Sequence, residues 1–63
     1  MGEELLVTVK EAGRRLGLGR SAAYALIQRG DLPSIKIGGA RRIAVADLHE
    51  FIRRLKEVTN EAL

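Results

Sequence analysis

The chain has 63 residues, one histidine and no cysteine, and its 11 lysines and arginines outnumber its eight acidic residues. A domain this small buries only about 60% of its unfolded surface, which leaves little room for a pocket with a supporting shell, so we expect no enzyme. Without cysteine there is no disulfide or thiolate site, and we expect neither a metal nor a cofactor.

The sequence shows neither a signal peptide nor an apolar stretch near the ~20 residues that span a bilayer, so we expect a cytoplasmic protein. The positive charge is concentrated in the middle. Residues 10–42 carry eight basic and two acidic residues, a net +6, whereas the preceding and following segments carry −2 and −1. This distribution favours a surface that binds a polyanion, although charges that only keep a small protein in solution would give the same pattern.

The first predicted helix follows a short extended lead-in over residues 5–7. Thr8 and Glu11 have the spacing of a capping box, in which the Thr8 hydroxyl accepts the Glu11 N–H and the Glu11 carboxylate reaches the Thr8 N–H. The helix runs to about Leu16, and Gly17 is suited to end it in a left-handed conformation. The apolar or small residues that share one face are Val9, Ala12, Gly13 and Leu16.

The second predicted helix covers residues 20–29, with Gly19 as its N-cap and Gly30 as its stop. At 100° per residue its inward positions are Ala23, Leu26 and Ile27. The opposite stripe consists of Ser21, Ala25 and Gln28, flanked by Arg20, Ala22, Tyr24 and Arg29.

Two short helices joined by residues 17–19 suit the crossed packing of a helix-turn-helix. Gly13 costs roughly 0.5–1 kcal/mol in a helix interior, a cost that is understandable if the second helix crosses close to it with the small Ala23 opposite. An ordinary pair of crossed helices that never touches DNA is the alternative.

Residues 34–37 and 43–45 alternate as the strands of a hairpin, with Ile35, Ile37 and Ile43 expected on the core side. Lys36 and Arg42 are expected on the other side. A two-residue Gly-Gly turn would pair Ile35 with Arg42 and mix the two faces, so we expect a loop of three to five residues.

The last predicted helix runs from Val45 to about Val58, with Leu48, Phe51, Ile52 and Leu55 at helical spacing and residues 59–63 frayed. The order helix, helix, hairpin, helix predicts a small α+β winged helix-turn-helix. We expect one domain over residues 1–63, with its core at residues 6–58.

Residues 6–55 resemble the excisionase family of helix-turn-helix domains, relatives of the MerR-type winged helix. The matching pieces are Val7–Ala12, Leu16–Leu18, Arg20-Ser21 with Tyr24, Arg29–Pro33, Ile37-Gly38, Arg41–Ile43 and Asp47-Leu48. The resemblance implies that the second helix enters the major groove and that the wing at residues 38–42 approaches an adjacent minor groove or its phosphates.

Carried over by position, the residues facing DNA are Arg20, Ser21, Tyr24 and Gln28 from the helix and Lys36, Arg41 and Arg42 from the hairpin. Ala22 and Ala25 depart from the family pattern. They reduce the number of helix side chains that can recognise bases, although either can contact a thymine methyl group. Gln28 can pair with adenine and Arg20 with guanine, while Ser21 can hold a phosphate. As alternatives, Gln28 is a solvated helix residue, Tyr24 is purely structural, and Arg41 and Arg42 only keep the hairpin soluble.

The resemblance implies a protein of the bacterial or phage-host cytoplasm that binds double-stranded DNA, associates with further copies on it, and biases an integrase, a site-specific recombinase, toward excision. A small MerR-like transcriptional regulator is the first alternative. The second is a protein-interaction module that docks on a recombinase without touching DNA, using the face of Glu50, Arg53, Arg54 and Glu57.

Overall fold

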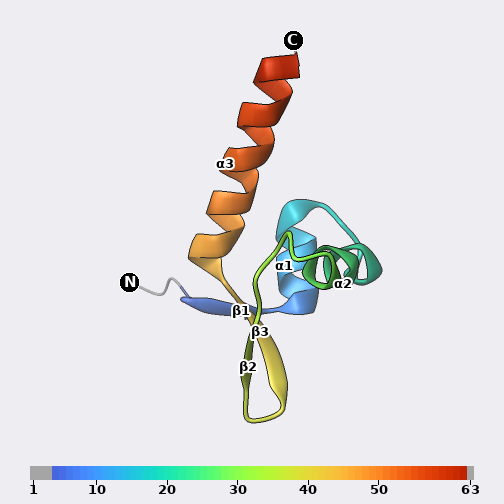
Figure 1. Cartoon of the computed structure of the whole chain (residues 1–63). Helices are drawn as coiled ribbons and strands as arrows, with labels where there is room; N and C mark the ends of the chain where they lie inside the picture. The colour runs from blue at the N-terminus through green and yellow to red at the C-terminus, as the bar shows by residue number, and fades with distance from the viewer. Residues whose placement is uncertain (1–3, 63) are drawn as a thin grey trace.

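The computed structural model describes residues 4–62, and side chains within residues 4–58. The elements in chain order are β1 (Leu6–Thr8), α1 (Val9–Leu16), α2 (Arg20–Gln28), β2 (Ile35–Ile37), β3 (Ala40–Ala44) and α3 (Val45–Ala62). Figure 1 shows α1 and α2 crossing on one side of a small sheet, with the β2–β3 hairpin and α3 extending in opposite directions. The predicted α+β fold, a winged helix-turn-helix, is confirmed.

The helix-turn-helix forms as the capping signals predict. Thr8 caps α1 by accepting the Glu11 N–H at 3.0 Å, but the carboxylate of Glu11 pairs with two arginines and does not complete the box. Gly17 ends α1 with φ 78°, and the Leu18 N–H donates to the Gly13 carbonyl at 2.7 Å. This tight turn brings α2 across α1.

The sheet has a third strand that the sequence analysis did not predict. The lead-in at Leu6–Thr8 is β1, which pairs antiparallel with β3, and the strand order is β1-β3-β2. Val7 lies opposite Ile43, and both are buried. Pairing with β3 therefore ties the start of the chain's described part to the hairpin.

The prediction of a three- to five-residue loop in the hairpin is wrong. Ile37 pairs with Ala40, so Gly38 and Gly39 form a two-residue turn with φ 58° and 105°. Both angles are positive, as a type I′ turn requires. The expectation failed because it assumed that both β2 isoleucines were core residues, whereas Ile35 and Ile37 are 42% and 52% exposed.

The register also changes which residues share a face. Directly opposed residues of an antiparallel pair lie on the same face. Lys36 therefore shares a face with its partner Arg41 and, two residues along β3, with Ile43. Arg42 lies on the other face with Ile35, opposite to the predicted grouping.

The core lies between the sheet and the helices. Its buried residues are Val7, Val9, Ala12, Ala23, Leu32, Ile43 and Leu48, with Leu16, Leu26, Ile27, Val45 and Phe51 partly buried around them. Val45 begins α3, as predicted, although it was also expected to end the second strand, and its N–H donates to the Leu5 carbonyl at 2.9 Å.

The third helix is longer than predicted, since α3 continues to Ala62 and not to Val58. Ile52 and Leu55, expected in its apolar stripe, are 37% and 50% exposed. Fraying of residues 59–62 stays a prediction, and Leu63 lies outside the described residues. None of the helices in residues 4–62 has the length and apolar character needed to cross a membrane.

Candidate nucleic-acid interface

The outward face of α2 presents the predicted helix residues to solvent. Ala23 is fully buried against α1, which turns the opposite side of the helix outward. The exposed residues are Arg20, Ser21, Ala22, Tyr24, Ala25 and Gln28. Their exposure agrees with the predicted stripe, while their contact with DNA stays a prediction.

The hairpin presents basic side chains on both of its faces. Lys36 and Arg41 are cross-strand partners on the face that continues into the core at Ile43. The Arg41 guanidinium donates to the Ser34 hydroxyl at 2.7 Å, which anchors it near the base of the hairpin. Arg42 lies on the opposite face, where its guanidinium donates to the Arg41 carbonyl at 3.2 Å.

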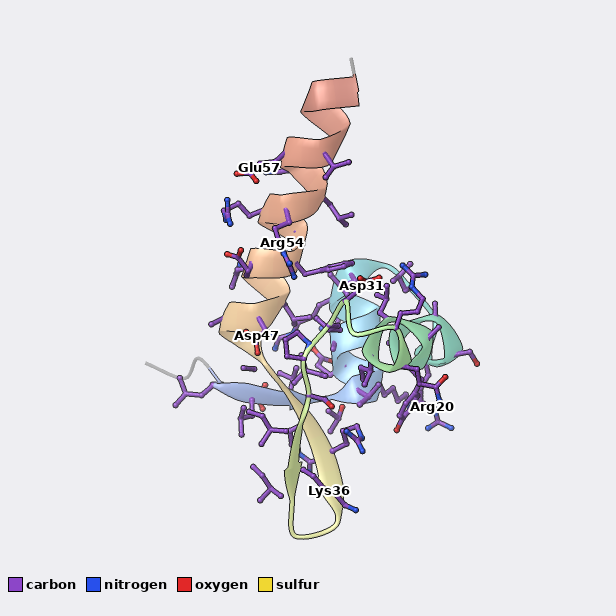
Figure 2. All side chains as sticks on the ribbon, viewed as in Figure 1. Arg20, Asp31, Lys36, Asp47, Arg54 and Glu57 are labelled. Carbon is purple, nitrogen blue, oxygen red and sulfur yellow. The ribbon has the colours of Figure 1, made fainter. Side chains whose placement is uncertain are left out.

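The relative placement of α2 and the hairpin can be followed from two of their predicted residues. In Figure 2 the labelled side chains of Arg20 and Lys36 extend to the same side, from α2 and the hairpin respectively. In Figure 1 the first turn of α1 lies between these two elements. In this view the start of α1 thus lies between the two basic elements, and Arg42 lies on the hairpin face opposite to that of Lys36 and Arg41.

The arginines and lysines divide into two classes. Arg14, Arg15, Arg29, Arg53 and Arg54 each form ion pairs within the molecule. Among the described side chains, those without an acidic partner are Lys10, Arg20, Lys36, Arg41, Arg42 and Lys56. All four predicted basic site residues belong to this second class, so their charge is available to an anionic ligand.

Glu11, in the first turn of α1, is bonded by two arginines. Its carboxylate accepts from the Arg14 guanidinium at 2.6 and 2.8 Å and from Arg15 Nε at 2.8 Å. These bonds, first to Arg14 and then to Arg15, lower the pKa of Glu11 from 4.5 to about 2. The carboxylate is therefore ionised and paired at neutral pH.

One basic residue near the predicted site was missed. Lys10, in the first turn of α1, lines a surface hollow together with Thr8, Glu11, Arg14, Leu18, Gly19 and Arg20. A second hollow shares Thr8 and Glu11 with the first and reaches Arg42 across the sheet. The sequence placed Lys10 in the basic segment, but only the crossing of the two helices sets it beside Arg20.

The described residues contain no group of three His, Cys, Asp or Glu side chains that could hold a metal ion. The surface described above is cationic, with exposed guanidinium and ammonium groups around the outward face of α2. Charges of this kind bind phosphate groups, and an exposed short helix fits the major groove of DNA.

Comparisons with known proteins agree with this geometry. A family described as a helix-turn-helix domain matches residues 6–56. A probable excisionase of Saccharopolyspora erythraea is 43% identical over 51 residues, 81% of this chain and 52% of that protein, so the chain spans about half its length. An excisionase of Streptomyces ambofaciens is 48% identical over 48 residues, 76% of this chain and 77% of that protein. No solved structure matches. With its helix-turn-helix, its basic hairpin and these relatives, the chain belongs to the excisionase family of helix-turn-helix domains.

Proposed function

We propose that the protein binds double-stranded DNA without catalysis and acts as an excisionase-like factor that shapes DNA for a recombinase. The observation that carries the proposal is the gathering of unpaired cations on α2 and the hairpin, beside an outward helix face with small and polar side chains. The excisionase names of the two relatives support it.

In this proposal, Gln28 and Arg20 of α2 recognise bases. The amide of Gln28 suits adenine and the guanidinium of Arg20 suits guanine, because each offers two hydrogen bonds to a base edge in the major groove. Ser21 contacts a phosphate near the start of the helix, where Gly19 supplies no side-chain cap. Ala22 and Ala25 contact thymine methyl groups, and Tyr24 flanks the phosphate backbone.

The hairpin contacts the adjacent minor groove or its phosphates. Its Gly38-Gly39 tip has no side chains, so backbone can approach the DNA closely. Lys36 and Arg41 on one face and Arg42 on the other allow a ribbon within a groove to meet phosphates on both walls. Four to six phosphate contacts give a log–log salt slope of roughly −4 to −5.

In this role several copies bind neighbouring sites, and contacts between them strengthen weak binding by each. The DNA so shaped favours excision by an integrase. The partnership and the self-association are supported by the family alone, whose members named here are excisionases.

Fluorescence anisotropy on random and genomic duplexes, at 50 to 300 mM salt, tests DNA binding. Footprinting on DNA selected from the source genome then gives the site and its repeat spacing. Tight, salt-sensitive binding beside a recombination site is the expected result. Absence of salt-sensitive binding to any duplex would defeat the proposal, and a footprint at a promoter alone would favour a MerR-like regulator.

A second candidate, docking on a recombinase without DNA, is favoured by one observation on α3. A groove between α2 and α3 is lined by the apolar residues Leu26, Phe51, Leu55 and Val58, of which the last is 64% exposed, and by Arg29, Gly30, Asp31 and Arg54. However, the charged side chains of the α3 face predicted for this role largely pair with one another, since Arg53 donates to both Glu50 and Glu57. Recombinase binding that persists at a salt concentration abolishing DNA binding would support this candidate.

A further inference from the structure

The hollow at the start of α1 and α2 is lined by one predicted DNA-facing residue, Arg20, and by residues that were not predicted to face DNA. We propose that it holds one phosphate group of the DNA backbone, with the Lys10 ammonium, the Arg20 guanidinium and the Thr8 hydroxyl as its contacts. This inference rests on the proposed function and adds Lys10 and Thr8 to the residues that carry it.

Lys10 and Arg20 come from different helices, yet both line this hollow. Neither has an acidic partner within 4 Å among the described side chains. Two cations that line one open depression repel each other, and a phosphate held between them would offset that repulsion and accept hydrogen bonds from both.

Thr8 lines the same hollow and supplies a neutral hydrogen-bond donor. Its Oγ1 accepts the Glu11 N–H at 3.0 Å and so caps α1, which fixes the position of the oxygen. Its hydroxyl hydrogen has no acceptor among the described residues and can turn toward a phosphate oxygen. The capping bond therefore orients a donor for the ligand.

Glu11 also lines the hollow, and a free carboxylate there would repel a phosphate. Arg14 and Arg15 both bond this carboxylate, so the three side chains together carry one positive charge. The arrangement cancels the one acidic group of the hollow and leaves its net charge positive.

The position of the hollow fits one strand of the duplex passing between the two proposed groove contacts. It shares Thr8 and Glu11 with the second hollow, which extends to Arg42 on the sheet. In the proposed complex, a DNA strand that runs from the major-groove contact of α2 to the hairpin would pass this hollow.

The test compares Lys10→Ala and Lys10→Gln with the parent by anisotropy across a salt series. We expect affinity for every duplex to fall about tenfold and the salt slope to lose about one unit, since one phosphate contact is removed. Lys10→Arg should restore binding. Lys56→Ala is the matched control, because Lys56 also has no acidic partner among the described side chains but lies on α3.

Single methylphosphonate substitutions along the bound duplex then locate the contact. The parent should lose affinity at one phosphate to which Lys10→Ala has become insensitive. Should Arg41→Ala weaken binding while Lys10→Ala and Lys56→Ala both bind like the parent, the inference about the hollow fails and the proposed function stands. A parent without salt-sensitive duplex binding would overturn both.

Discussion

Gly13 of α1 and Ala23 of α2 touch where the two helices cross. A Cβ atom on Gly13 would lie 3.3 Å from the Ala23 Cβ, and 3.1 and 3.2 Å from the carbonyl oxygens of Leu18 and Gly19. The crossing therefore depends on the absence of a side chain at residue 13, and it sets the angle at which α2 is presented.

Gly13→Ala tests this crossing through stability. Helix propensity alone would stabilise the protein by about 1 kcal/mol, but three contacts shorter than 3.4 Å must relax. We expect the free energy of unfolding to fall by about 1–2 kcal/mol, measured by urea denaturation. Gly19→Ser is the control, since the space around Gly19 is open and serine is a better N-cap. A more stable Gly13→Ala protein would contradict the close crossing.

The hairpin turn gives a second stability prediction. Gly38 has φ 58°, an angle that asparagine adopts readily, whereas Gly39 has φ 105°, which strains any residue with a Cβ. We expect Gly38→Asn to be neutral or to stabilise by up to about 1 kcal/mol, and Gly39→Ala to destabilise by about 1–2 kcal/mol. Thermal unfolding measures both. Equal effects at the two positions would argue against the two-residue turn.

The two helices of the turn motif were predictable because their signals are local. Periodicity placed Ala23 inward, and Gly13, Gly17 and the Thr8 cap marked how α1 ends and meets α2. The hairpin register was not predictable in the same way. Alternation predicted that Ile35 is a core residue, but β2 is an edge strand whose outer face has no helix over it. The exposure of Ile35 and the register of β2 with β3 therefore both differ from the prediction.

The candidate site was likewise predictable only where its residues are fixed by local structure. The outward face of α2 follows from helical geometry and was predicted. The separation of Arg41 and Arg42 onto opposite faces depends on a turn of two residues, and the placement of Lys10 beside Arg20 depends on the crossing of two helices. Such relationships join residues distant in sequence and leave no periodic signal.

Glu11 should make stability depend on pH in the acidic range. Its pKa is lowered to about 2 in the folded protein, first by Arg14 and then by Arg15, from the 4.5 expected when unfolded. The stabilisation is therefore complete above pH 4.5 and is lost as pH falls toward 2. Urea midpoints measured from pH 6 to pH 2 should decline less steeply in Glu11→Gln than in the parent. Parallel declines would show that the ion pairs do not persist in solution.

Arg41→Ala and Gln28→Ala should affect DNA binding in different ways. Arg41 is proposed to contact phosphate, so its removal should weaken binding to all duplexes alike and reduce the salt slope by about one unit. Gln28 is proposed to read a base, so its removal should cost about 1–3 kcal/mol at one position and relax preference there. Anisotropy with a panel of single-base variants separates the two effects. Arg53→Ala, on α3 and paired with Glu50 and Glu57, serves as the control and should bind like the parent. If all three variants bind every duplex as the parent does, the assignment of α2 and the hairpin as the DNA-binding surface is wrong.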